Sequence, residues 1–292
     1  MSNKVTTIPK KMCFFWAGGK MSWLRYLTLQ TFCLHNPSWE TTLYVSRDSE
    51  SKPVWTSQEQ QDFCGYDGPD WMHDAYNLPI NVQVVDLPSN LDPVHQCDMY
   101  QWKVLHEHGG WYSDMDILYM HSMDDLMHKC ASSDLVAPLP CGDFTIGFLG
   151  CKPGLKFFEL MYNSCKDGGE PSQYQDFGTN RVCQILKIRP HSPGHFMAQR
   201  IMERYNHRLF TPSPGDDVYP WNWRGIEQIW EWSHDLPPSQ IGIHWFAGSP
   251  ISQKYNNWFT PKNWKEHPCT FTRHLQGRSK IPGIWEPENS RS

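Results

Sequence analysis

The chain has 292 residues, a length typical of one large α/β domain or of one domain with insertions. Its formal net charge of −5 disfavours a nucleic-acid partner, because proteins that bind nucleic acid usually present a basic face. The ten Cys include no C-x-x-C pair, which disfavours a zinc knuckle.

Strand-like and helix-like segments alternate over the first part of the chain. Short apolar runs bounded by Gly, Pro or polar residues predict strands at 11–17, 41–46, 82–87 and 111–120. Apolar residues at helical spacing predict helices at 22–36 and 94–108. The polar residues 48–80 read as an insertion with short helices. This alternation predicts an α/β fold with a Rossmann-like mixed central sheet and helices on both faces.

The second half continues the pattern and then changes composition. Residues 135–137 and 144–150 are expected to be strands, and 155–165 and 179–186 to be helices. Residues 190–240 form an aromatic-rich region, and IGIHWFAGS at 241–249 is expected to be a strand that runs into a loop. We expect a single catalytic domain over 1–262 and a peripheral tail over 263–292.

The N-terminal segment gives an expectation about the compartment. Its apolar run, CFFWA, is too short for a signal peptide or for a membrane span. We therefore expect no transmembrane segment and a soluble, cytoplasmic protein with reduced thiols. A peripheral contact with a membrane stays open.

Two acids in the strand at 111–120 suggest a metal site. Side chains alternate across a strand, so Asp114 and Asp116 project to the same side and can converge on one point. Two unpaired carboxylates there would repel each other, and a divalent cation removes that penalty. Mn²⁺ or Mg²⁺ prefers oxygen ligands and often shares them with phosphates, which favours a nucleoside diphosphate as the ligand.

Three further polar residues have two interpretations each. His244 beside Trp245 is either a core or surface histidine, or a neutral imidazole that binds Mn²⁺ beside the two acids. Asp143 and Asp176 are either acids that bond within a loop or cap a helix, or acids that face a bound substrate. Asp176 is the preferred candidate for the second role.

These acids lie in a longer motif that resembles a known family. The motif is Asp98-x-x-Gln101…Leu105…Gly109-Gly110-Trp111-Tyr112-x-Asp114-x-Asp116. It resembles the glycosyltransferase family with a DXD sugar-binding region, which includes α-mannosyltransferases, capsular polysaccharide enzymes and, more distantly, the large clostridial glucosylating toxins. The segments IPKKMCFFWAGG and HWFAGS resemble the opening and closing segments of that family.

The resemblance implies a GT-A fold and a role for each matching residue. Asp114 would contact ribose and metal, Asp116 would be the main metal ligand, and Asp98 would bond the donor sugar. Further contacts to the donor nucleotide or its pyrophosphate would come from Phe15, Trp16, Ala17, Tyr112 and Ser249, with His244 as a third metal ligand. The residues expected to act in catalysis are Asp98 and Gln101, which lie in the matching motif, and Asp176, which is chosen for its place before the helix expected at 179–186.

One position departs from the family motif. The family usually has Arg three residues after the first acid, and this chain has Gln101, which has no charge. The change alters the choice of donor or weakens activity, unless the lost charge is supplied from elsewhere, such as Arg25 or Arg181.

The resemblance implies a metal-dependent retaining glycosyltransferase. It would transfer a sugar from a nucleoside-diphosphate sugar, with UDP as the first choice of nucleotide and GDP as the second, to a hydroxyl of a glycan acceptor. Retention by a front-face route needs no protein nucleophile. Two alternatives stay open: a non-catalytic protein that binds sugar nucleotides or glycans, and a metal-dependent phosphoesterase.

Overall fold

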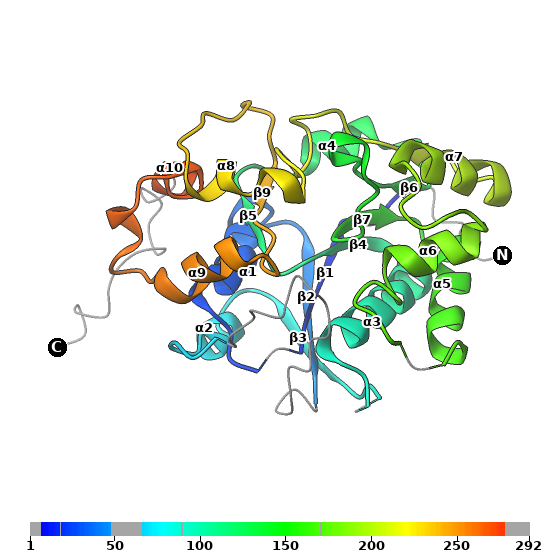
Figure 1. Ribbon diagram of the computed structural model, residues 1–292, viewed down its shortest axis with the longest axis horizontal. Coiled ribbons are helices and arrows are strands. Elements are labelled where there is room, and N and C mark those ends of the chain that lie inside the picture. Colours follow the sequence, from blue (N-terminus) through cyan, green and yellow to red (C-terminus); the bar gives the residue numbers. More distant parts are fainter. Residues whose placement is uncertain (1–6, 18, 48–65, 89, 170, 278–292) are drawn as a thin grey trace.

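The computed structural model describes residues 7–17, 19–47, 66–88, 90–169 and 171–277, and all structural statements refer to these residues. A central sheet is flanked by helices on both sides (Figure 1). The strands are β1 (Lys11–Trp16), β2 (Glu40–Ser46), β3 (Asn81–Val85), β4 (Gly110–Ser113), β5 (Ile117–Tyr119), β6 (Leu135–Val136), β7 (Phe148–Cys151), β8 (Leu209–Phe210) and β9 (Gly242–His244). The α-helices are α1 (Trp23–His35), α2 (Met72–Tyr76), α3 (Pro93–His108), α4 (Asp124–Lys129), α5 (Lys156–Asp167), α6 (Thr179–Leu186), α7 (Gly194–Tyr205), α8 (Glu227–Trp230), α9 (Pro250–Trp258) and α10 (Thr270–Gln276).

The main sheet has seven strands in the order β3-β2-β1-β4-β7-β6-β8. β1, β2, β3 and β4 are parallel, whereas β7 runs antiparallel to both β4 and β6. β5 and β9 form a separate antiparallel pair. The expected mixed α/β fold, with helices on both faces of the sheet, is confirmed.

Side-chain alternation along the strands divides the core into two clusters. Cys13 and Phe15 of β1 pack on the face covered by α3 and α5, and Met12 and Phe14 pack on the face covered by α1. Both faces of these strands are buried. β1 is a near-continuous hydrophobic run, as is typical of parallel strands, and β2 also buries Thr41, Thr42 and Ser46.

The order of the strands defines where a ligand would bind. From β1 the chain crosses to β2 on one side, and β4 pairs with β1 on the other side. Open α/β sheets bind ligands at such a switch point, outside the carboxyl ends of the strands. Here those ends are Trp16 of β1 and Ser113 of β4, and Asp114 follows directly.

Several elements differ from the sequence-based expectations. The strand expected at 111–120 is interrupted at 114–116 and forms β4 and β5, which belong to different sheets. The strand expected from 144 begins at Phe148, and the region after 190 contains the helix α7. α2 is one short helix of the expected insertion, whose residues 48–65 lie outside the described residues.

The C-terminal region forms a third hydrophobic cluster with the β5–β9 pair. Phe271 and Leu275 of α10 are fully buried there with Trp230 of α8, Leu118 of β5 and Ile243 of β9. Residues 263–277 are therefore packed into the molecule, in contrast to the expected peripheral tail, and 278–292 lie outside the described residues. None of the helices in the described ranges combines the length and hydropathy that a membrane span requires.

Candidate metal and donor site

Asp114 and Asp116 lie in the bend that joins β4 to β5, not within one strand as expected. The Asp114 N–H donates to the carbonyl of Gly147 at 2.8 Å, which continues the pairing of β4 with β7. The Thr28 hydroxyl of α1 donates to the Met115 carbonyl at 3.1 Å and accepts from the Ile117 N–H at 3.2 Å. The two carboxylates therefore converge because the bend is held from both sides.

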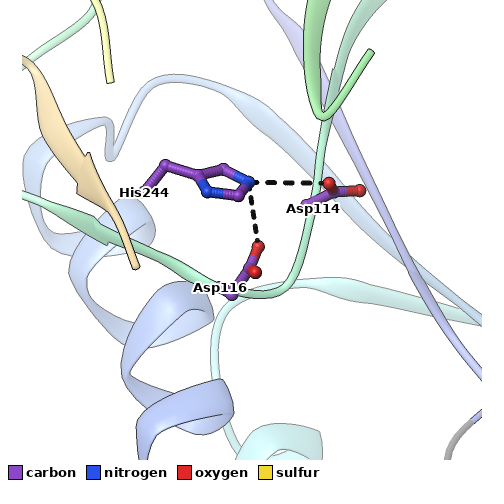
Figure 2. Close-up of side chains that lie close together, drawn as sticks. All are labelled: Asp114, Asp116 and His244. Carbon is purple, nitrogen blue, oxygen red and sulfur yellow. Dashed lines mark ion pairs between the residues drawn. The ribbon is translucent and has the colours of Figure 1, made fainter. Parts of the chain in front are cut away.

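His244 reaches the two acids through the pairing of β5 with β9, in which Ile117 lies opposite His244. Its Nε2 lies 3.2 Å from an oxygen of Asp116 and 3.6 Å from an oxygen of Asp114 (Figure 2). One ligand atom from each of the three residues lies within 4.8 Å of the others. The structure thus brings together the three residues that the sequence singled out as metal ligands.

The turn after β9 orients Asp116. Phe246 adopts a left-handed backbone conformation with φ 52°, which is uncommon for a residue other than Gly. The next N–H, that of Ala247, donates to Oδ2 of Asp116 at 2.7 Å, across 131 positions of the chain. The other oxygen, Oδ1 of Asp116, is buried and has no hydrogen-bond partner.

The charges of this cluster fit a divalent cation. Burial lowers the pKa of His244, but the charges of Asp116 and Asp114 outweigh burial and raise the pKa above its ordinary value. Oδ1 of Asp116 accepts no hydrogen bond, and its close neighbour is Nε2 of His244. Mn²⁺ or Mg²⁺ accepts oxygen and imidazole ligands, so the same atoms fit such an ion. Asp114 is partly exposed, so a ligand can reach the cluster from solvent.

Tyr219 completes the wall behind the cluster. Its ring stacks on His244 with the centroids 4.8 Å apart and an interplanar angle of 25°. A methyl group on Gly147 would come 2.3 Å from an oxygen of Asp114 and 3.0 Å from the Tyr219 hydroxyl, so only Gly fits between them. Tyr219 lies in the aromatic-rich region 190–240, and nothing local in the sequence connects it with His244.

Asp98 and Gln101 lie on the same face of α3 and are both buried. Burial, followed by the nearby charge of Asp114, raises the pKa of Asp98 well above its ordinary value. No described residue donates a hydrogen bond to Asp98. The Gln101 amide donates to the Ile146 carbonyl at 2.5 Å, so it anchors the segment that leads to Gly147.

Of the residues expected to contact the nucleotide, two are half-buried and three are buried. Trp16 is half-buried at the end of β1, and Ser249 is half-buried at the N-cap of α9. Phe15 and Ala17 are buried in the core, and Phe15 packs against Tyr100. Tyr112 is also buried, and its hydroxyl donates to Oδ1 of Asp114 at 3.2 Å. In this structure Tyr112 therefore orients a candidate metal ligand.

The carboxylates of Asp176 and Asp143 accept hydrogen bonds from other residues of the protein. Oδ2 of Asp176 accepts hydrogen bonds from the N–H groups of Ser172 and Gln173, at 2.7 and 2.9 Å. Asp143 accepts from Asn222 at 3.1 Å and from Arg224 at 3.4 Å. Asp176 thus has the local role that was the alternative to facing an acceptor, whereas Asp143 joins its loop to a segment about 80 positions farther along the chain.

The fold and site together define a mixed α/β protein with an Asp–Asp–His cluster at the switch point of its sheet. The family described as "Glycosyltransferase sugar-binding region containing DXD motif" matches residues 25–132, which include Asp98, Asp114 and Asp116. This match confirms the resemblance drawn from the sequence over residues 25–132. No curated protein matches the chain.

Solved glycosyltransferases are similar to this chain at low sequence identity. The PaToxG glycosyltransferase is 12% identical, with a TM-score of 0.40 over 69% of this chain and 86% of its own. The galactosyltransferase LgtC, solved with donor and acceptor sugar analogues, is 11% identical with a TM-score of 0.42 over 94% and 98%. The glycosyltransferase GlyE of Streptococcus pneumoniae TIGR4 is 10% identical with a TM-score of 0.41 over 94% and 66%. TM-scores this low support no conclusion about the function of this chain.

Proposed function

We propose that this protein is a metal-dependent retaining glycosyltransferase. It takes a sugar from a nucleoside diphosphate, UDP first and GDP second, and transfers it to a hydroxyl of a glycan acceptor. The observation that carries the proposal is the convergence of Asp114, Asp116 and His244, in which the buried Oδ1 of Asp116 lies 3.2 Å from Nε2 of His244 and accepts no hydrogen bond. Both aspartates lie in the segment that matches a DXD glycosyltransferase family.

Asp114, Asp116 and His244 would hold Mn²⁺ or Mg²⁺. Such an ion, when bound, stabilises the charge that develops on a departing diphosphate. Because the imidazole of His244 must be unprotonated to bind the ion, its raised pKa makes metal binding weaker as the pH falls.

Asp98 would position the donor sugar. Its raised pKa favours the protonated carboxyl, which can donate one hydrogen bond to a sugar hydroxyl and accept another. Gln101 would act on the same site indirectly, since it anchors the Ile146 carbonyl in the segment next to Asp114.

In this proposal the chain supplies no nucleophile. The acceptor hydroxyl attacks the anomeric carbon from the side that the diphosphate leaves, the bond from that carbon to the phosphate oxygen breaks, and a phosphate oxygen takes the hydroxyl proton. The hydrogen bonds of Asp176 within its own loop are consistent with a route that needs no basic side chain at the acceptor.

A screen of donors tests the proposal. Thermal shift is measured with UDP-sugars and GDP-sugars, with and without Mn²⁺, and the release of free nucleotide is then followed. We expect one nucleotide class to stabilise the protein only with Mn²⁺, and Asp116→Ala to abolish this stabilisation. Asp125→Ala, which removes an exposed acid of α4, is the matched control and should keep it.

Three outcomes count against the proposal. Full retention of Mn²⁺-dependent donor binding by Asp116→Ala would remove its basis. Binding of the donor without any release of nucleotide, with every glycan acceptor supplied, would favour a sugar-nucleotide binding protein. Release of inorganic phosphate from phosphoesters would favour a phosphoesterase.

A further inference from the structure

Arg25 is a cation near the metal cluster to which no role has been assigned. It lies in the first turn of α1 and is half-buried. Its guanidinium lies over the ring of Trp16, 5.6 Å from the centroid, and over the ring of Trp245, 5.3 Å from the centroid. Among the residues that the structure describes, no carboxylate forms an ion pair with Arg25.

The two tryptophans connect Arg25 to the site. Trp16 ends β1 at the switch point of the sheet. Trp245 follows His244 directly, and the backbone N–H of Trp245 donates to the backbone carbonyl of Asp116 at 2.9 Å.

The site otherwise has an excess of negative charge. Asp114 and Asp116 converge there, and Gln101 provides no cation at the position where the family motif has Arg. Arg181, the other candidate source of charge, donates to the Ser164 and Asp176 carbonyls at 3.1 Å each. Arg181 is therefore held by α5 and the loop after it, whereas no hydrogen bond or ion pair joins the Arg25 guanidinium to another residue in the described part of the chain.

We propose that Arg25 binds the diphosphate of the donor and replaces the cation that is missing at position 101. The inference rests on the proposed function and assigns to the same site a residue that binds the diphosphate. A guanidinium presents a planar fork of donors that matches phosphate oxygens bidentately. Contact with two indole rings orients that fork before the ligand arrives, which reduces the entropy lost on binding.

Calorimetry with inorganic pyrophosphate as the probe tests this inference without assuming a base or a sugar. Binding is measured for Mn²⁺ alone and for pyrophosphate in the presence of Mn²⁺. We expect Arg25→Gln to weaken pyrophosphate binding at least tenfold. We expect the same variant to bind Mn²⁺ alone as tightly as the unchanged protein or more tightly, because it lacks a nearby positive charge.

Two further variants control the experiment. Arg25→Lys keeps the charge and loses the fork, and an intermediate loss is expected. Arg200→Gln removes an exposed arginine of α7 that lies 5.5 Å from the centroid of the Phe196 ring, and it should bind pyrophosphate like the unchanged protein.

The outcomes separate this inference from the proposed function. Equal pyrophosphate affinity in Arg25→Gln and the unchanged protein overturns the role of Arg25 alone. A parallel loss of Mn²⁺ and pyrophosphate affinity also overturns it, because that pattern indicates a structural role. If the unchanged protein binds neither Mn²⁺ nor pyrophosphate with Mn²⁺, the proposed function fails and the inference fails with it.

Discussion

Asp217 is a buried acid that positions the wall of the metal cluster. Its Oδ1 accepts from the Tyr219 N–H at 2.8 Å, and its backbone carbonyl accepts from the Ile241 N–H at 3.0 Å. These bonds fix the segment before Tyr219, the residue that stacks on His244. Burial raises the pKa of Asp217 from 3.8 to about 7. Placing this carboxylate next to β9 therefore destabilises the fold at neutral pH.

We predict that Asp217→Asn makes the stability of the protein less dependent on pH. A carboxyl whose pKa is higher in the fold than in the unfolded chain stabilises the fold fully below pH ~4, and this contribution is lost as the pH rises through about 7. Asn keeps the acceptor for the Tyr219 N–H, so the variant should be ~2–4 kcal/mol more stable than the unchanged protein at pH 8. Urea unfolding from pH 4 to pH 8 measures this. A stability difference that does not change with pH would contradict it.

At the scale of elements, α1 holds the strand that carries the metal ligands. β5 pairs with β9 on one edge only, and its free backbone groups meet hydroxyls of α1. Thr28 bonds Met115 and Ile117, and Thr31 accepts from the Tyr119 N–H at 3.1 Å. α1 thus takes the place of a neighbouring strand, because buried N–H and C=O groups require partners.

Thr28→Val should damage both stability and metal binding. It leaves the Met115 carbonyl and the Ile117 N–H unpaired, which costs about 1–3 kcal/mol. Because Met115 lies between the two aspartates, Mn²⁺ affinity should fall as well. Unfolding in urea and titration with Mn²⁺ give the two values.

Thr31→Val is the matched control for this experiment. It removes a hydroxyl of the same kind from the next turn of α1, farther along β5 from the aspartates. A similar loss of stability with a smaller loss of Mn²⁺ affinity is expected. Equal Mn²⁺ affinity in Thr28→Val and the unchanged protein would show that α1 does not shape the bend.

At the scale of the whole molecule, the C-terminal cluster supports the β5–β9 pair from the side opposite the main sheet. Phe271 is fully buried, and its ring stacks on Trp230 with the centroids 4.9 Å apart. The same cluster includes Leu118, Ile243 and Trp245, which are neighbours of the site in sequence. The last helix therefore contributes to the placement of Asp116 and His244.

Phe271→Ala should lower the free energy of unfolding by about 3–5 kcal/mol, since it leaves a cavity in a packed aromatic cluster. Phe271→Leu, which keeps most of the volume, should cost markedly less. Denaturant titration of both variants distinguishes them. A loss below about 1 kcal/mol in Phe271→Ala would mean that residues 263–277 are as peripheral as the sequence suggested.

Local patterns predicted much of the fold and part of the site. Short apolar runs identified β1 and β2 within one residue of their bounds. The i, i+2 spacing singled out Asp114 and Asp116, and the family motif added Asp98. The same reasoning missed α7, although Met197, Ala198 and Ile201 have helical spacing and Pro193 precedes the first turn. The region was described only by its aromatic-rich composition, which predicts no particular secondary structure.

What the sequence determined by itself is what residue type and short spacing control: the strands, the acid pair and the family region. Only the tertiary structure decided that the acids lie in a bend, that His244 meets them there, and that the guanidinium of Arg25 lies between Trp16 and Trp245. These contacts join residues far apart in the chain, and strand pairing and side-chain packing, which no local pattern encodes, bring them together.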